Sequence, residues 1–257
     1  MHLVSVYRYP VKGLSPEALP EAQLRPGETL ADDRRFALEV APWKFDAAAP
    51  RHMPKSRFLM LMKDGALARL KTRYDSATRI LTLTPPAGNG AAPMTLDLSK
   101  PDGPVALEEW ISAYLGEDLR GAVRLCEAPG HSFSDVAAKC LSMINLASLR
   151  ALETAWNTPL DPLRFRANLY IDGLAPWAER DWLGKTLRFE TAEGPALEVF
   201  LETTRCAATN VDPQTGKRAG NLPARLLKDF GANVLGVYAE CLSGGRIAPG
   251  DSFILSA

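Results

Sequence analysis

Short apolar segments bounded by glycine or proline recur along this chain of 257 residues. The first, residues 3–9, contains branched and aromatic side chains such as Val6 and Tyr7, and it ends at Pro10, which cannot donate to a strand ladder. Comparable segments follow at residues 35–40, 59–62, 80–83, 168–171, 186–190, 197–201, 234–241 and 252–255. Many short strands at this spacing predict a mainly β, α+β fold of two β-barrel-like units decorated with a few helices.

Two segments have helical spacing instead. In residues 104–115, apolar side chains such as Leu107 recur at helical intervals, and Pro104 suits a first helical turn. Asn145 is expected to cap a second helix over residues 146–156, in which leucines fall along one side.

One composition break divides the chain. Residues 85–104 are rich in proline, glycine and asparagine, which favour turns over regular elements. We therefore predict a domain boundary here, with a first domain at residues 1–97 and a second at residues 98–257.

The balance of charge excludes several classes of partner. The chain has 30 Lys and Arg against 30 Asp and Glu, so its net charge of +0 gives no long-range field to attract nucleic acid or anionic lipid. Its first residues lack the basic start and apolar core of a signal peptide, and no apolar run is long enough to cross a bilayer. We therefore expect a cytoplasmic protein with no nucleic-acid partner and no membrane partner.

The four cysteines are Cys126, Cys140, Cys206 and Cys241. With no CxxC pair they give neither a zinc-finger spacing nor a small disulfide framework, so each is judged by its surroundings. Cys206 follows a predicted strand and starts a turn-forming loop. Arg205 and the hydroxyls of Thr203 and Thr204 favour a thiolate there, the form that binds metal or attacks. Taken alone, a single loop cysteine is also consistent with an idle small residue.

Cations and an amide lie at the edges of other predicted strands, where barrels bind ligands. They are Lys12, Arg34, Arg166 and Asn168. A phosphate-bearing ligand needs guanidinium or ammonium charge together with neutral donors, and this set supplies both. The alternative interpretation is that these side chains are ordinary solvated charges.

The order of these segments resembles the MOSC family, the molybdenum cofactor sulfurase C-terminal domain proteins. YPVKG at residues 9–13 and Asp33-Arg34 are similar to motifs of the family's N-terminal β-barrel domain, with Gly13 in place of a usual serine. The MOSC domain proper is matched by FRAN at 165–168, the segment 179–182, RCAATNVDPQTG at 205–216 and GRIAPGD at 245–251. The resemblance implies a MOSC N-terminal β-barrel domain at residues 1–97 and a MOSC domain at residues 98–257.

The resemblance also implies roles for individual residues. In the amidoxime-reducing branch of the family, the cysteine of the RC motif binds molybdenum, which implies that Cys206 binds the metal of a molybdenum cofactor (Mo-molybdopterin). The positions implied to bind this cofactor are Lys12, Arg34, Ser148, Arg166, Asn168, Thr204, Arg205 and Cys206. Asp212 is a candidate catalytic proton relay, although an Asp-Pro turn also explains it.

The implied activity is a molybdenum-dependent oxidoreductase that reduces small N-hydroxylated (N-oxygenated) substrates. The sequence ends at Ala257 without a fused ferredoxin domain, so we expect electrons from a separate ferredoxin- or cytochrome-type protein with its reductase. Two alternatives stay open. The protein is either a sulfur carrier or cofactor-transfer protein that uses a Cys206 persulfide, or a binding module for another phosphorylated ligand in which Cys206 is incidental.

Overall fold

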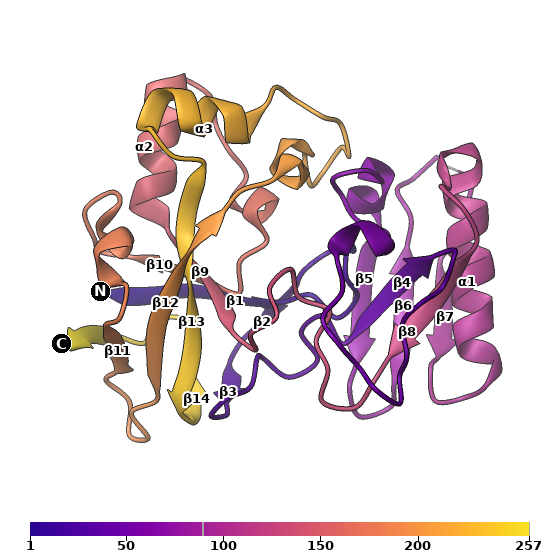
Figure 1. Ribbon diagram of the computed structural model, residues 1–257, viewed down its shortest axis with the longest axis horizontal. Helices are drawn as coiled ribbons and strands as arrows, with labels where there is room; N and C mark the ends of the chain where they lie inside the picture. Colours follow the sequence, from indigo (N-terminus) through magenta and orange to yellow (C-terminus); the bar gives the residue numbers. More distant parts are fainter. Residues whose placement is uncertain (89, 257) are drawn as a thin grey trace.

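The computed structural model describes residues 1–88 and 90–256. Asn89, in the predicted boundary segment, and Ala257, at the end of the predicted second domain, lie outside the described residues. The described part is mainly β with a few helices, which confirms the predicted fold class. Figure 1 shows two units side by side, a larger one that contains both chain ends and a smaller one.

The larger unit is built on one eight-stranded sheet. Its strands, in spatial order, are β15 (Phe253–Ser256), β11 (Thr186–Phe189), β12 (Ala196–Thr204), β13 (Val234–Ser243), β9 (Leu141–Asn145), β10 (Leu169–Asp172), β1 (His2–Arg8) and β2 (Glu17–Leu19). Two helices, α2 (Leu146–Trp156) and α3 (Leu222–Phe230), lie over one end of this sheet (Figure 1). The short strands β3 (Ala22–Leu24) and β14 (Gly245–Ile247) pair with each other.

The eight-stranded sheet does not close into the predicted barrel. β1 meets the residue that precedes β15 at one isolated bridge, between His2 and Ser252. The later residues of β1, from Val6 to Arg8, pair with β2 instead. β15 and β2 therefore remain the two edges of an open sheet.

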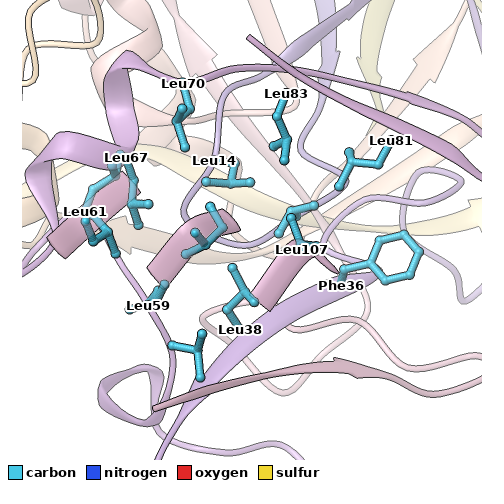
Figure 2. Packing of buried hydrophobic residues seen from close by; sticks show 14 of the residues in the cluster. Leu14, Phe36, Leu38, Leu59, Leu61, Leu67, Leu70, Leu81, Leu83 and Leu107 are labelled. Atoms are coloured by element: carbon cyan, nitrogen blue, oxygen red, sulfur yellow. The ribbon is translucent and has the colours of Figure 1, made fainter. Parts of the chain in front are cut away.

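The smaller unit combines two small sheets with one helix. β4 (Phe36–Val40) pairs with β8 (Val123–Glu127), and β5 (Lys71–Asp75), β6 (Ile80–Thr84) and β7 (Met94–Asp97) form a three-stranded sheet. Helix α1 (Asp102–Leu115) packs against β7 and β8. Apolar side chains from these elements fill one core, shown in Figure 2, in which Leu38 and Leu107 are fully buried.

The predicted domain division between residues 97 and 98 stays a prediction. In the structure, α1 and β8 contribute to the core of the smaller unit, whereas β1 pairs with β10 of the larger sheet. Segments from both sides of the predicted boundary therefore contribute to each unit.

Most predicted elements are confirmed, but the strand expected at residues 59–62 is wrong. The backbone turns there, because the Asp64 carboxylate accepts the Met60 N–H at 2.8 Å and the Met60 carbonyl accepts the Lys63 N–H at 2.9 Å. The cap predicted at Asn145 is confirmed, since its side-chain oxygen accepts the Ala147 N–H at 3.0 Å. No helix within the described residues is long and apolar enough to cross a membrane.

Helix α3 and several short strands were not predicted from the sequence. The strands are β2, β3, β5, β7, β8, β9 and β14. A signal for α3 was present, because Asn221 caps this helix by accepting the Ala224 N–H at 3.2 Å, and a proline occupies its first turn. The missed strands have three to five residues each, which leaves little room for a recognisable alternation.

A buried polar cluster anchors α2 to the segment that follows β10. Ser148 and Asn145 both donate to the Glu179 carboxylate, at 2.8 and 3.0 Å, and the Ser148 hydroxyl accepts the Trp177 N–H at 2.8 Å. All three side chains of this cluster are fully buried. Burial raises the pKa of Glu179 and outweighs the opposing effect of its hydrogen bonds with Asn145 and Ser148.

Leu107→Ala is expected to destabilise the protein by about 2–5 kcal/mol, because it opens a cavity in the core of the smaller unit. Val105→Ala on the same helix is the control, since the Val105 side chain is 51% exposed. The control should change the free energy of unfolding by less than about 0.5 kcal/mol. Urea unfolding followed by circular dichroism measures both variants, and equal losses would contradict the assignment of this core.

Glu179→Gln is expected to change how stability depends on pH. A carboxyl whose pKa is raised on folding binds more protons in the folded chain, so its stabilisation is present at low pH and is lost as pH rises through the folded pKa. The variant lacks the carboxyl, so it does not lose this stabilisation as pH rises. Its free energy of unfolding relative to wild type should therefore rise from about pH 4 to about pH 8. Urea titrations over this range test the expectation, with Glu190→Gln at an exposed position as the control. A constant difference between Glu179→Gln and wild type would rule it out.

Candidate functional site

Cys206 lies two residues after the end of β12 and directly before a short 3-10 helix, Ala207–Asn210. The Arg205 N–H donates to the Asn233 carbonyl at 2.8 Å, and the Thr209 N–H and hydroxyl donate to the Cys206 carbonyl at 3.0 and 2.9 Å. The other three cysteines are buried, whereas Cys206 is partly exposed. The fold thus fixes the backbone of Cys206 and leaves its side chain accessible.

Cys206 lines a cavity of about 390 Å³ whose walls come from both units. This volume is typical of small-molecule sites. Six side chains of the wall are cationic and two are acidic: Lys12, Arg34, Lys55, Arg164, Arg166 and Arg205 against Asp135 and Glu202. Because the net charge of the whole chain is +0, the cavity concentrates positive charge locally.

Two of these cations flank the buried ring of Tyr9. The guanidinium carbons of Arg34 and Arg166 each lie 4.4 Å from its centroid. Burial raises the pKa of Tyr9 to about 12 and outweighs the two arginines, which lower it, so the phenol stays neutral. Arg34 also donates to the Asp33 carboxylate at 2.5 Å and to the Arg166 carbonyl at 2.9 Å. Tyr9 therefore supports both guanidinium groups at the cavity wall.

Arg166 differs from Arg34 in having free donors. Within residues 1–88 and 90–256, its guanidinium N–H groups have no hydrogen-bond or ion-pair partner. Both arginines have a left-handed backbone, with φ of +49° for Arg34 and +54° for Arg166, which is uncommon for a residue with a side chain. Such conformations cluster at binding and catalytic sites.

Asp135 joins two lysines of the cavity wall. Its carboxylate accepts from Lys12 Nζ at 2.5 Å and from Lys55 Nζ at 3.0 Å. Burial raises the pKa of the Asp135 carboxyl, but the two ammonium groups outweigh this and hold it well below its usual range. Burial lowers the pKa of Lys55, but interactions with Asp135 and Cys206 outweigh burial and raise this pKa above its usual value. Lys55 and Cys206 both line the cavity. Sequence reasoning missed Asp135 and Lys55, because the Lys12–Asp135 pair spans 123 positions.

Arg205 and Asn168 line the cavity, but both side chains form hydrogen bonds with other groups of the protein. Arg205 donates through Nε to the Leu235 carbonyl at 2.8 Å and through Nη1 to the Phe165 carbonyl at 2.9 Å. Asn168 accepts the Ser142 hydroxyl at 3.0 Å. These contacts join β9, β10 and β13 around the cavity.

Two threonines complete this wall. Thr204, a predicted site residue, and its neighbour Thr203 both line the cavity. The Thr203 hydroxyl oxygen is buried and has no hydrogen-bond partner among the described residues. An unsatisfied hydroxyl at a cavity wall is a candidate contact for a ligand.

The structure does not bring Ser148 and Asp212 to the cavity wall. Ser148 belongs to the buried cluster with Glu179 described above. Asp212 pairs with Arg164 at 2.6 Å and accepts the Gln214 N–H at 3.0 Å, so its carboxylate closes a turn.

Gly13 stands where the MOSC family usually has serine, and the backbone conformation at this position explains why glycine fits here. Its φ is +85°, and a Cβ atom here would lie 3.0 Å from the Leu59 carbonyl oxygen. Side chains are rarely tolerated in this conformation. Glycine therefore fits this turn at the cavity wall.

Comparisons with known proteins identify a domain family for slightly less than half of the chain. A family model described as the MOSC domain matches residues 129–253. A search of curated proteins found no match. Among solved structures, YiiM from Geobacillus stearothermophilus is 20% identical and covers 46% of this chain and 54% of its own, with a TM-score of 0.36. YiiM from Escherichia coli is 19% identical, with the same coverage and a TM-score of 0.33.

A third solved structure spans nearly the whole chain. The YUAD protein from Bacillus subtilis is 10% identical and covers 99% of this chain and 94% of its own, with a TM-score of 0.47. The match to the YiiM proteins extends over about half of their length. At these TM-scores the likenesses are weak, and the family assignment depends on the domain model.

The matched range contains the segments that line the cavity in the larger unit. It includes Arg166, Asn168 and Cys206, together with the closing GRIAPGD segment. MOSC domains are associated with the molybdenum cofactor. Residues 129–253 of this chain are a MOSC domain.

Proposed function

We propose that this protein is a molybdenum-cofactor-dependent oxidoreductase that reduces N-hydroxylated (N-oxygenated) compounds with electrons from a separate donor protein. The observation that carries the proposal is the partly exposed Cys206 side chain in a cavity with six cationic side chains. Thiolate is a suitable ligand for a soft metal centre, and the cations suit the phosphate of a pterin cofactor. The MOSC domain at residues 129–253 supports a function connected with the molybdenum cofactor.

The residues of the cavity fit such a group. Among the described residues, the Arg166 guanidinium has no hydrogen-bond partner, and neither has the buried Thr203 hydroxyl. Buried polar groups without partners cost free energy, which an oxygen-rich ligand would recover. No group of three or more His, Cys, Asp or Glu side chains in the described part of the chain is placed to hold a metal ion by itself.

Within this proposal, different residues hold the cofactor and shape its surroundings. Lys12, Arg34 and Arg166 supply positive charge for the phosphate, and Cys206 Sγ supplies the protein ligand to the metal. Arg205 and Asn168 fix the strands around them. Ser148 and Asp212 act in the scaffold rather than on the cofactor or substrate.

When bound, the molybdenum centre supplies two-electron chemistry that removes oxygen from nitrogen. The overall reaction is R–NH–OH + 2 e⁻ + 2 H⁺ → R–NH₂ + H₂O, in which the N–O bond breaks and one N–H and one O–H bond form. Met60, Leu61 and Leu201 add apolar surface to the cavity, and Leu201 is partly open to solvent. These side chains would bind the organic part of the substrate and exclude water.

Cys206→Ser is expected to abolish reduction of benzamidoxime by removing the sulfur ligand to molybdenum. Cys140→Ser is the matched control, because Cys140 lines the same cavity but is buried, and burial raises the pKa of its thiol to about 12. Wild type and both variants would be purified from a host that makes the cofactor, analysed for molybdenum and pterin, and assayed with reduced methyl viologen. The control should keep its metal and its activity.

Two results of this experiment would count against the proposal. Wild-type protein that contains no molybdenum when purified from such a host would instead favour sulfur carriage by a Cys206 persulfide. Full activity of Cys206→Ser would show that the metal does not depend on this thiol.

A pair of arginine substitutions separates cofactor binding from folding. Arg166→Gln removes a guanidinium that has no hydrogen-bond partners among the described residues and contacts the Tyr9 ring, so it should destabilise the metal-free protein less than Arg205→Gln does. Its affinity for the cofactor should fall roughly tenfold or more, given about 1.5–3 kcal/mol for a charged hydrogen bond. Arg205→Gln removes bonds to two carbonyls inside the fold and should destabilise the metal-free protein. Urea unfolding and pterin content measure both effects, and equal destabilisation by the two variants would refute this division of roles.

A further inference from the structure

We infer that a basic surface beside the cavity binds an acidic electron-carrier protein, an inference that rests on the proposed function and names its partner. The basic surface consists of six cations: Lys63, Arg69, Lys71, Arg73, Lys217 and Arg218. All except the half-buried Arg69 are exposed. Residues 63–73 of the smaller unit supply four of them, and the loop at residues 211–220 of the larger unit supplies two.

Contacts between these two stretches bring the cations together. Arg218 Nη2 donates to the carbonyl oxygens of Leu61 and Met62, at 3.0 and 2.8 Å. Lys71 Nζ donates to the Gln214 side chain at 3.4 Å. In Figure 1 the loop that precedes α3 reaches across to the smaller unit. Segments far apart in the sequence therefore build one surface.

Ion pairs do not compensate the charge of the basic surface. Across residues 1–88 and 90–256, none of its six cations has a carboxylate within ion-pair distance. Of the acids nearby in the sequence, Asp64 pairs with Arg120 at 2.8 Å and Asp212 pairs with Arg164 at 2.6 Å, whereas Asp75 interacts electrostatically with Arg73 without forming an ion pair. Like charges gathered without counter-charges repel one another, and a negatively charged partner would relieve this repulsion.

The position of the basic surface favours an electron carrier over other acidic partners. Leu61 and Met62, whose carbonyls hold Arg218, also line the cavity that contains Cys206. A redox protein docked here would therefore meet the cavity wall without entering the cavity. A reduced [2Fe–2S] ferredoxin gives up one electron and becomes oxidised, so two dockings supply the electron pair that, with two protons, breaks one N–O bond.

The first test is direct binding, with a dye-labelled acidic [2Fe–2S] ferredoxin as the probe. Lys71→Glu/Lys217→Glu should weaken its binding roughly tenfold or more, and raising salt from about 50 mM to about 500 mM should weaken wild-type binding similarly. Lys100→Glu/Lys228→Glu is the control, because it changes the net charge equally at two exposed lysines outside the basic surface. Fluorescence anisotropy should give the control the wild-type affinity.

Activity assays then separate this inference from the proposed function. With reduced methyl viologen, both double variants should reduce benzamidoxime at the wild-type rate. With ferredoxin and its reductase as the donor, only Lys71→Glu/Lys217→Glu should lose rate. If wild-type protein does not reduce benzamidoxime with methyl viologen, the proposed function is wrong. Ferredoxin binding would still test whether the basic surface binds an acidic electron carrier. Unchanged ferredoxin affinity in Lys71→Glu/Lys217→Glu would overturn the inference, as would tighter wild-type binding to a DNA duplex than to ferredoxin.

Discussion

The buried Arg205 guanidinium joins the segments that form the cavity around Cys206. Its Nε reaches the Leu235 carbonyl in β13, and its Nη1 reaches the Phe165 carbonyl, immediately before Arg166. Because Arg205 also precedes Cys206 in the chain, these bonds set the place of the thiol relative to Arg166. A planar guanidinium can hold two carbonyls in fixed directions, which the ammonium of lysine does less well. The geometry of the site therefore depends on this one side chain.

The cavity keeps part of its positive charge because two of its cations are supported by neutral groups. Arg166 packs against the Tyr9 ring, and Arg205 donates to carbonyl oxygens, whereas Arg34 also pairs with the Asp33 carboxylate. Desolvation of these guanidinium groups is costly, so an anion that enters the cavity gains electrostatic energy that exposed cations could not provide. Asp135 compensates part of the charge and ties the smaller unit to the cavity wall.

The grouping of Cys206 with Lys12, Arg34 and Arg166 came from the resemblance to the MOSC family, because these residues are far apart in the chain. Local signals in the sequence predicted the fold class and the cap at Asn145. Each of these depends on residues close together in the chain, where spacing and turn chemistry are readable. Asp135 could not be found in this way, because its partner Lys12 is 123 positions away. For Ser148, the direction of the side chain could not be predicted from the sequence. It lies one turn beyond the strand end at Asn145, but α2 directs its hydroxyl to Glu179 rather than to the cavity.

X-ray absorption at the molybdenum edge tests most directly whether Cys206 binds the metal. We predict one more sulfur neighbour around molybdenum in the wild-type protein than in Cys206→Ser, when both are purified from a host that makes the cofactor. The same number of sulfur neighbours in the two proteins, or wild-type protein without molybdenum, would contradict the assignment of Cys206 as the metal ligand.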